Sequence, residues 1–211
     1  MTVSAAAATG SQGLWFLSRG SGLVLLALFS VVVVLGVATR TGSAPRRWPR
    51  FAVAELHRTL SLFAVALLVL HVVTAILDPF VTIGWAATVL PFASPYRTLA
   101  IGLGTLAVDL GGAVLLTSLA RPRLGQRAWR AVHWLAYLAW PAAFLHSRTA
   151  GNDLGIWWVA LIEVASAAAV ATAVLARLFS RGGPPEPGPG PRRPLADDPR
   201  VTRARPTARA S

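Results

Sequence analysis

The chain has 211 residues, of which 55% are hydrophobic and only 13% charged, and its mean hydropathy is +0.58. A soluble globular domain carries about 25% charged residues, so this composition excludes an ordinary water-soluble protein. Every basic residue behind the net charge of +12 is an arginine. These arginines lie between apolar blocks and near the C-terminus, which indicates a membrane surface rather than nucleic acid as the partner. The chain has no cysteine, which excludes disulfides and cysteine-ligated iron–sulfur clusters.

Five apolar spans predict an all-α membrane protein, a bundle of about five transmembrane helices. Each span approaches the roughly 20 residues that cross a bilayer as a helix. Helices are favoured because lipid offers no partner for unpaired backbone groups. We expect an N-terminal segment at 1–13, a membrane domain at 14–179 and a tail at 180–211. The spans run from about Leu14 to Ala38, Phe51 to Leu77, Tyr96 to Leu119, Ala128 to Ser147 and Gly155 to Phe179.

The arginines predict the orientation of the chain in a plasma membrane. Four follow the first span and four surround the start of the fourth, whereas the opposite loops carry only Arg97 and Arg148. By the positive-inside rule, the N-terminus lies outside and the C-terminus in the cytoplasm. The tail at 180–211 is rich in proline, glycine and arginine, so we expect it to be disordered. At that length it is also too short to form a flavin or nicotinamide domain.

All four histidines lie in two of the spans. His57 and His71 are 14 residues apart in the second span, and His133 and His146 are 13 apart in the fourth. Such intervals cover roughly 21 Å and 20 Å of helix, which is most of the thickness of the bilayer. Because both spans run from the cytoplasmic side to the outer side, His57 and His133 share the cytoplasmic depth, and His71 and His146 share the outer depth. An ionisable group inside a membrane is a functional hypothesis by default. Because a haem iron takes one imidazole on each face, two stacked haems would form an electron path across the bilayer.

Two points qualify this interpretation. Thirteen residues leave an ideal helix about 140° short of four full turns. We therefore expect a kink or π-type bulge at Pro141 in the fourth span. The alternative is a non-redox accessory or scaffold protein whose histidines only hydrogen-bond neighbouring helices. With neither cysteine nor an internal methionine, a haem in this chain would be non-covalent and ligated by histidine.

Two stretches resemble the ferric reductase-like transmembrane domain, especially its small actinobacterial-type members. They are His57-Arg58-Thr59-Leu60 through Leu70-His71, and Trp129-Arg130-Ala131-Val132-His133-Trp134 through Leu145-His146. The superfamily includes ferric reductases, NADPH oxidases and the haem subunit of the periplasmic methionine sulfoxide reductase system. The resemblance covers about Leu14 to Phe179. It implies two haems b, one between His57 and His133 and the other between His71 and His146.

The resemblance also implies a membrane haem-dependent oxidoreductase, acting as an electron-transfer subunit. Unlike the large reductases, this chain lacks a flavin domain, so its donor would be a separate flavoprotein or a membrane quinol. The acceptor would lie at the outer face and be a ferric chelate, oxygen or a partner reductase.

Several further residues are candidates for supporting roles, and none is predicted to be catalytic. Arg58 and Arg130 adjoin the cytoplasmic histidines and Arg148 follows an outer one, so they could bind haem propionates or be ordinary interfacial arginines. Asp109 and Glu163 lie within spans and fit proton or quinone chemistry, or a helix–helix hydrogen bond, which we favour. Close helix packing is indicated by Gly102, Gly104, Gly111 and Gly112.

Overall fold

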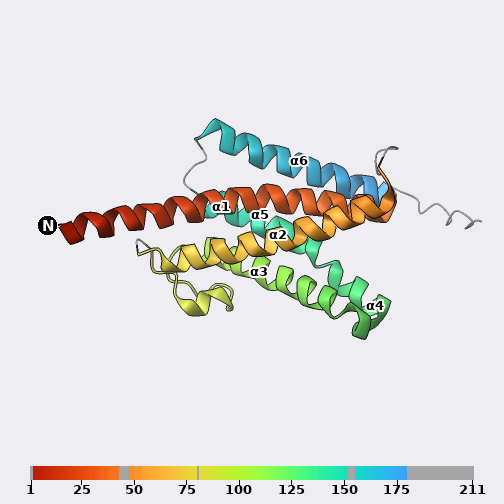
Figure 1. Cartoon of the computed structure of the whole chain (residues 1–211), viewed down its shortest axis with the longest axis horizontal. Coiled ribbons are helices and arrows are strands. Elements are labelled where there is room, and N and C mark those ends of the chain that lie inside the picture. The colour runs from red at the N-terminus through yellow and green to blue at the C-terminus, as the bar shows by residue number, and fades with distance from the viewer. Residues whose placement is uncertain (1, 43–47, 80, 152–154, 180–211) are drawn as a thin grey trace, which may run out of the picture. The chain divides into compact units, whose positions relative to one another are not determined.

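The computed structural model describes residues 2–42, 48–79, 81–151 and 155–179. Within them, the chain forms six α-helices and one short 3₁₀ helix and contains no strand, which confirms the predicted all-α class (Figure 1). The tail at 180–211, which we expect to be disordered, lies outside the described residues. The elements are α1 (Thr2–Thr41), α2 (Arg50–Leu77), η1 (Trp85–Thr88), α3 (Thr98–Leu119), α4 (Arg121–His133), α5 (Ala136–Ala150) and α6 (Trp157–Phe179).

Four of these helices are long and apolar enough to cross a membrane, namely Gln12–Thr41 of α1 together with α2, α3 and α6. The predicted fourth span, 128–147, is divided between α4 and α5, which have 13 and 15 residues. Neither alone reaches the roughly 20 residues that a membrane crossing needs. The first helix begins at Thr2, so residues 2–13 of the expected N-terminal segment (1–13) form one helix with the first span. The chain is therefore a multi-pass membrane protein.

Local sequence explains where several helices end or bend. Asp78 caps α2 in an extended conformation, with φ −67° and ψ 115°, because the following residue is Pro79 and the residue before a proline is disfavoured in a helix. Gly125 interrupts α4 with φ 73° and ψ 160°, a conformation that favours glycine. No residue of α4 is buried. This helix therefore covers the end of the bundle and contributes little to its core.

The helices alternate in direction: α1, α3 and α6 run one way, and α2 and α5 run the other (Figure 1). Helix α1 packs against α2, α6 and α5, while α3 packs against α5 and α4. Helix α2 makes no comparable contact with α3, α4 or α5. Side chains of α1, α5 and α6 form the core, where Trp140 Nε1 donates to Ser30 Oγ at 2.9 Å. The bundle thus has two halves, α1 with α2 and α6, and α3 with α4 and α5. A space lies between α2 of one half and α5 of the other.

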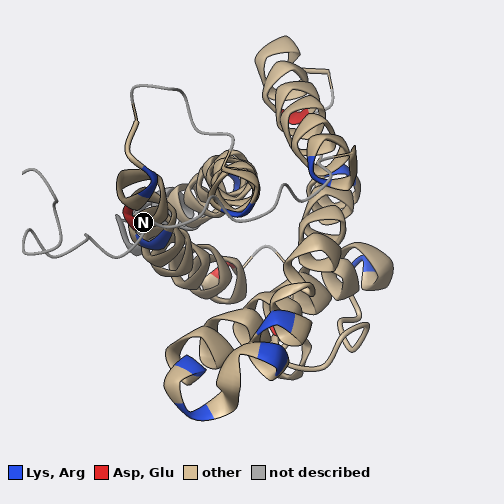
Figure 2. Ribbon diagram, turned by 90° about the vertical axis from the view of Figure 1, so that its right-hand side faces the viewer, with Lys and Arg blue, Asp and Glu red and all other residues tan. Residues whose placement is uncertain are grey.

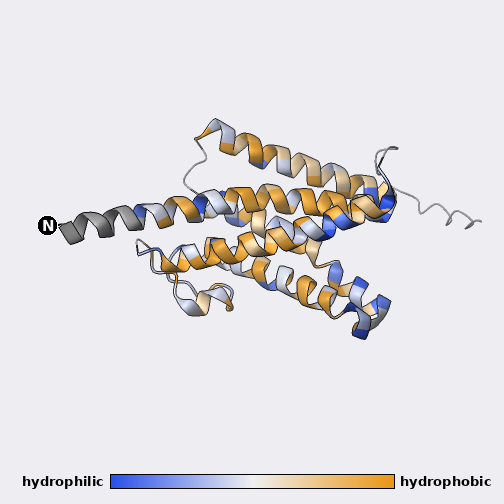
Figure 3. Ribbon diagram, in the orientation of Figure 1, coloured by the Kyte–Doolittle hydropathy of each residue, from blue (hydrophilic) through white to orange (hydrophobic). Residues whose placement is uncertain are grey.

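The ends of the bundle are polar and its middle is apolar, as Figure 3 shows. Large apolar side chains such as Phe63, Leu116 and Phe179 are exposed on the outside, at 65%, 66% and 79%. Lipid would cover such a surface. Figure 2 shows the basic residues, which gather where α1 ends, α2 begins and α4 lies. Arg40 lies in the last turn of α1, Arg50 begins α2 and Arg177 lies in the last turn of α6. Helix α4 carries Arg121, Arg123, Arg127 and Arg130.

Candidate functional site

One large cavity receives all four histidines. His57 and His71 come from α2, His133 is the last residue of α4, and His146 lies in α5. The cavity has a volume of about 1870 Å³, and each of the four side chains lines it. Pockets for single small ligands usually measure about 300–1,000 Å³. The space between the two halves of the bundle is therefore large enough for more than one sizeable cofactor.

Two of the histidines, His71 and His146, meet across this cavity. The rings of His71 and His146 lie 6.3 Å apart between centroids, at an interplanar angle of 80°. His57 and His133 both line the cavity at its other end, where α2 begins and α4 ends. His71 and His146 form one of the two pairs that equal depth in the membrane predicted. An imidazole nitrogen binds a metal ion at about 2 Å, so the separation of His71 and His146 can accommodate one metal ion between their rings.

Three of the imidazoles are oriented by backbone carbonyls of neighbouring helices. Nδ1 of His57 donates to the carbonyl of Val32 at 3.0 Å. Nδ1 of His71 donates to that of Ser18 at 2.8 Å, and Nδ1 of His146 to that of Ala100 at 2.7 Å.

A carbonyl oxygen only accepts hydrogen bonds, so in each of these three rings the proton lies on Nδ1. The other nitrogen, Nε2, then carries a lone pair. Histidines that ligate metals are usually held in this way, with the second ring nitrogen bonded to a carbonyl or carboxylate.

Glycines create the space in which the same three rings lie. A Cβ added to Gly22 would lie 2.8 Å from Cε1 of His71, and one added to Gly36 would lie 3.2 Å from Cε1 of His57. A Cβ on Gly104 would lie 2.7 Å from Nδ1 of His146. The sequence predicted Gly104 only as a general packing residue and missed the other two. The missed signal was their spacing, since Gly22 and Gly36 are 14 residues apart, like His57 and His71.

His133 is held differently. Its Nδ1 is buried without a hydrogen-bond partner among the described residues. Its ring lies against Trp129 instead, with centroids 4.8 Å apart and an interplanar angle of 31°. Trp129 is in turn fixed by Arg121, whose guanidinium lies 4.4 Å from the indole centroid, and by Ser118, which accepts from Nε1 at 3.3 Å. An aromatic contact therefore replaces the carbonyl that orients the other three imidazoles.

The turn between α4 and α5 brings His133 to the same cavity as His146. Leu135 donates to the carbonyl of Val132 at 2.9 Å, and Leu138 to that of Leu135 at 3.0 Å. These i-to-i+3 hydrogen bonds wind the chain tighter, adding about 20° of rotation per residue relative to an α-helix. The added rotation recovers part of the angular deficit calculated for this span. This irregular turn lies at Trp134 and Leu135, whereas Pro141, where we expected the kink, lies inside α5.

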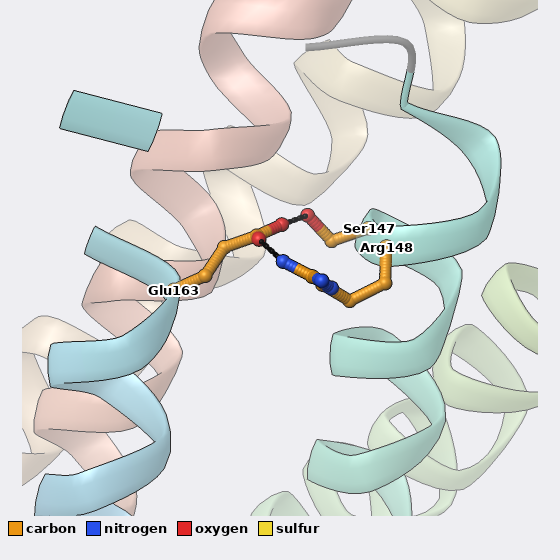
Figure 4. A network of polar contacts seen from close by, with 3 residues as sticks. All are labelled: Ser147, Arg148 and Glu163. Atoms are coloured by element: carbon orange, nitrogen blue, oxygen red, sulfur yellow. Dashed lines mark hydrogen bonds and ion pairs between the residues drawn. The ribbon is translucent and has the colours of Figure 1, made fainter. Parts of the chain in front are cut away.

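The three candidate arginines differ in their surroundings. Arg58 and Arg130 line the cavity, next to His57 and close to His133 in sequence. Arg148 does not line it. Its NH1 donates to Oε2 of Glu163 at 2.6 Å (Figure 4). The structure thus gives Arg148 an anionic partner within the protein.

The two carboxylates within spans also differ. Glu163 is almost completely buried and takes part in a helix–helix hydrogen bond, the role that we favoured for both. Asp109 does not line the cavity, and it forms no hydrogen bond or ion pair with the residues that the structure describes. Neither carboxylate joins the histidines in a conventional metal site. Indeed, no group of three or more His, Asp or Glu side chains in the described ranges could hold a metal ion alone.

Comparison with known proteins identifies the family. No curated protein and no solved structure matches the chain. The family described as "Ferric reductase like transmembrane component" matches residues 21–144, more than half of the chain. The matched segment contains His57, His71 and His133 and ends just before His146. The chain therefore belongs to the ferric reductase-like transmembrane component family.

Proposed function

We propose that the chain is a haem-b subunit that transfers electrons across the membrane. One haem lies between His57 and His133 and the other between His71 and His146. The observation that carries the proposal is the hydrogen bonding of the imidazoles. Three Nδ1 atoms donate to backbone carbonyls, which leaves three Nε2 lone pairs in rings that line one cavity.

The donor set fits a haem better than a bare metal ion. Each pair supplies only two imidazoles, and no third His, Asp or Glu of the described residues joins them. Two ligands do not complete the coordination of an iron ion, whereas a porphyrin fills the remaining positions and needs one imidazole on each face. When bound, haem supplies an iron that takes up and releases one electron at a time.

Other residues of the cavity have supporting roles in this proposal. Arg58 and Arg130 line it and offer guanidinium groups to the anionic propionates. Arg148 has no role in binding a propionate in this proposal, because its side chain forms an ion pair with Glu163. Apolar residues such as Leu26, Val65 and Leu68 line the cavity between the two sites along the helices.

The direction of transfer follows from the arginines. Their concentration at one end of the bundle favours that end as the cytoplasmic side, with the N-terminus outside. Electrons would enter at His57 and His133 from a separate flavoprotein or a membrane quinol. They would leave at His71 and His146 to a ferric chelate, oxygen or a partner reductase. The chain would therefore act as one subunit of a plasma-membrane oxidoreductase.

Single histidine variants of the full-length protein test the proposal. Wild-type protein should contain two haems that acid–acetone extracts, because the chain has no cysteine for covalent attachment. His57→Ala and His133→Ala should each lose one haem, and His71→Ala and His146→Ala should each lose the other. The measurements are the haem content and a redox titration of each variant.

Two results would count against the proposal. Folded wild-type protein that stays colourless after haem supplementation would favour a non-redox scaffold with structural histidines. Loss of the same haem in His57→Ala and His146→Ala would overturn the pairing.

A further inference from the structure

A buried carboxylate ties α6 to the turn of α5 that follows His146. Glu163 of α6 is only 1% exposed. Its Oε2 accepts from NH1 of Arg148 at 2.6 Å, and its Oε1 accepts from Oγ of Ser147 at 3.2 Å. Figure 4 shows the three side chains meeting between the two helices. Both donors are therefore the residues that directly follow His146 in the chain.

A buried carboxylate is costly unless hydrogen bonds satisfy it, and removing one partner leaves an uncompensated charge. Glu163 avoids that cost only while Ser147 and Arg148 keep their positions. The side chain of Arg148 is 41% exposed, so the cation stays at the boundary of the bundle while the carboxylate is inside. The pair thus fixes the rotation and height of this turn relative to α6.

Helix α3 and the residue before it hold the same turn from the other side. The carbonyl of Ala100 accepts from Nδ1 of His146, and Gly104 leaves room for the ring. Arg97 NH1 donates to the carbonyls of Thr149 and Ala150 at 3.1 Å and 3.0 Å. The end of α5 is consequently held between two elements, and the carboxylate of Glu163 is the contact from α6.

We propose that Glu163 is a positioning residue for His146. It holds the turn after His146 so that the imidazole keeps its orientation toward His71. This inference rests on the proposed function, because the oriented imidazole matters only if it ligates the outer haem. The other site has no such contact within the described part of the chain, since His133 is oriented by Trp129. Loss of the carboxylate should therefore affect one haem and spare the other.

Glu163→Gln in the full-length protein tests this role. The side chain keeps its size but loses its charge and one acceptor, so the turn is held less firmly. We expect about tenfold weaker haem retention at the His71 and His146 site, the lower end of what loss of a ligand's supporting partner costs. The midpoint potential of that haem should shift, and hydrogen exchange should rise at residues 143–151. The haem of His57 and His133 should keep its potential and occupancy. His57→Ala and His71→Ala, which each retain one haem, identify the two signals.

Matched variants separate this role from a general loss of stability. Asp109→Asn removes another intramembrane carboxylate, one that does not line the cavity, and should leave both haems unchanged. Arg148→Lys keeps the charge and should retain most of the outer haem. If Glu163→Gln fails to fold, Ser147→Ala, which removes only the longer hydrogen bond, should weaken the outer haem alone and to a smaller extent.

The outcomes distinguish the two proposals. Wild-type protein without haem would overturn the proposed function and this role together. Wild-type protein with two haems, and Glu163→Gln with the same two potentials and occupancies, would overturn only the role of Glu163. Equal losses of both haems in Ser147→Ala would also contradict it, because they would show a structural effect on the whole bundle.

Discussion

Three imidazoles share one environment, a carbonyl acceptor at Nδ1 and a glycine against the ring, although they contact two different helices. Gly22 and Gly36 of α1 lie against His71 and His57, and Gly104 of α3 lies against His146. The fourth imidazole has neither feature among the described residues. The residues that matter most for the proposed ligands are thus small ones, whose role is to let a ring approach the backbone of the next helix.

Gly104→Ala should selectively damage the outer site. The added Cβ would lie 2.7 Å and 2.8 Å from Nδ1 and Cε1 of His146, closer than real contacts allow. The ring must then leave its position against the carbonyl of Ala100. Overpacking of this kind costs about 1–3 kcal/mol, which corresponds to a loss of haem retention of roughly 5- to 150-fold. Haem content and the redox titration of the purified variant provide the measurement.

Gly112→Ala is the matched control, because a Cβ there meets nothing within 4 Å and Gly112 does not line the cavity. It lies on the same helix and should leave both haems in place. If Gly104→Ala retained both haems with unchanged potentials, the orientation of His146 described above would be wrong. Equal damage from the two substitutions would instead indicate a general sensitivity of α3.

The junction of α4 and α5 decides how the fourth predicted span presents its two histidines. The backbone changes from i-to-i+4 to i-to-i+3 hydrogen bonds just after His133, at Trp134 and Leu135. Helix α5 then continues through Pro141. Pro141→Ala should therefore leave both haems bound, since the proline does not set the relative rotation of His133 and His146. Inserting one alanine between Trp134 and Leu135 should remove the haem of His57 and His133, here called the inner haem. The insertion rotates α4 by about 100° relative to α5 and so turns His133 away.

The measurement is the haem content of Pro141→Ala and of the alanine-insertion variant. The outer haem should persist in the insertion variant, because His146 and its contacts with α3 lie beyond the inserted residue. Loss of the inner haem in Pro141→Ala, with the insertion tolerated, would place the decisive bend at the proline after all.

Sequence was sufficient for the features that depend on local chemistry. The apolar runs predicted both ends of four membrane helices to within a few residues, and the spacing of the histidines predicted that the rings of His71 and His146 would meet. It was insufficient where neighbouring helices decide the outcome. The contact of Gly36 with His57 depends on how α1 lies against α2, and the bond between Arg148 and Glu163 depends on how α6 lies against α5. The i-to-i+3 turn at Trp134 carries no proline or glycine that would mark it.

At the scale of the whole molecule, the bundle is divided into two halves that α1 connects. Helix α1 contacts α2, α6 and α5, whereas α2 makes no comparable contact with α3 or α5. Arginines gather at one end of both halves. The same axis that separates the two histidine pairs is therefore also the axis along which the charge is distributed.

This distribution predicts the topology of the chain. A reporter that is active only in the cytoplasm should be active when fused after Phe179, where α6 ends on the arginine-rich side. The same reporter fused after Gly84, in the connection between α2 and α3, should be inactive, because that connection lies at the opposite end. A reporter that works only outside the membrane should give the reverse pattern. Activity of the cytoplasmic reporter at Gly84 alone would invert the orientation and exchange the names of the two sites.

The partnership of α1 with α2 also has a consequence for biosynthesis. Both carbonyls that orient His57 and His71 belong to α1, and so do the two glycines beside those rings. These two helices are consecutive, so a ribosome has released everything that this hairpin needs before α3 is made. Half of each proposed ligand pair can thus be preset early in translation. The opposite half, on α4 and α5, arrives later, so cofactor loading would follow completion of the second half rather than guide the first.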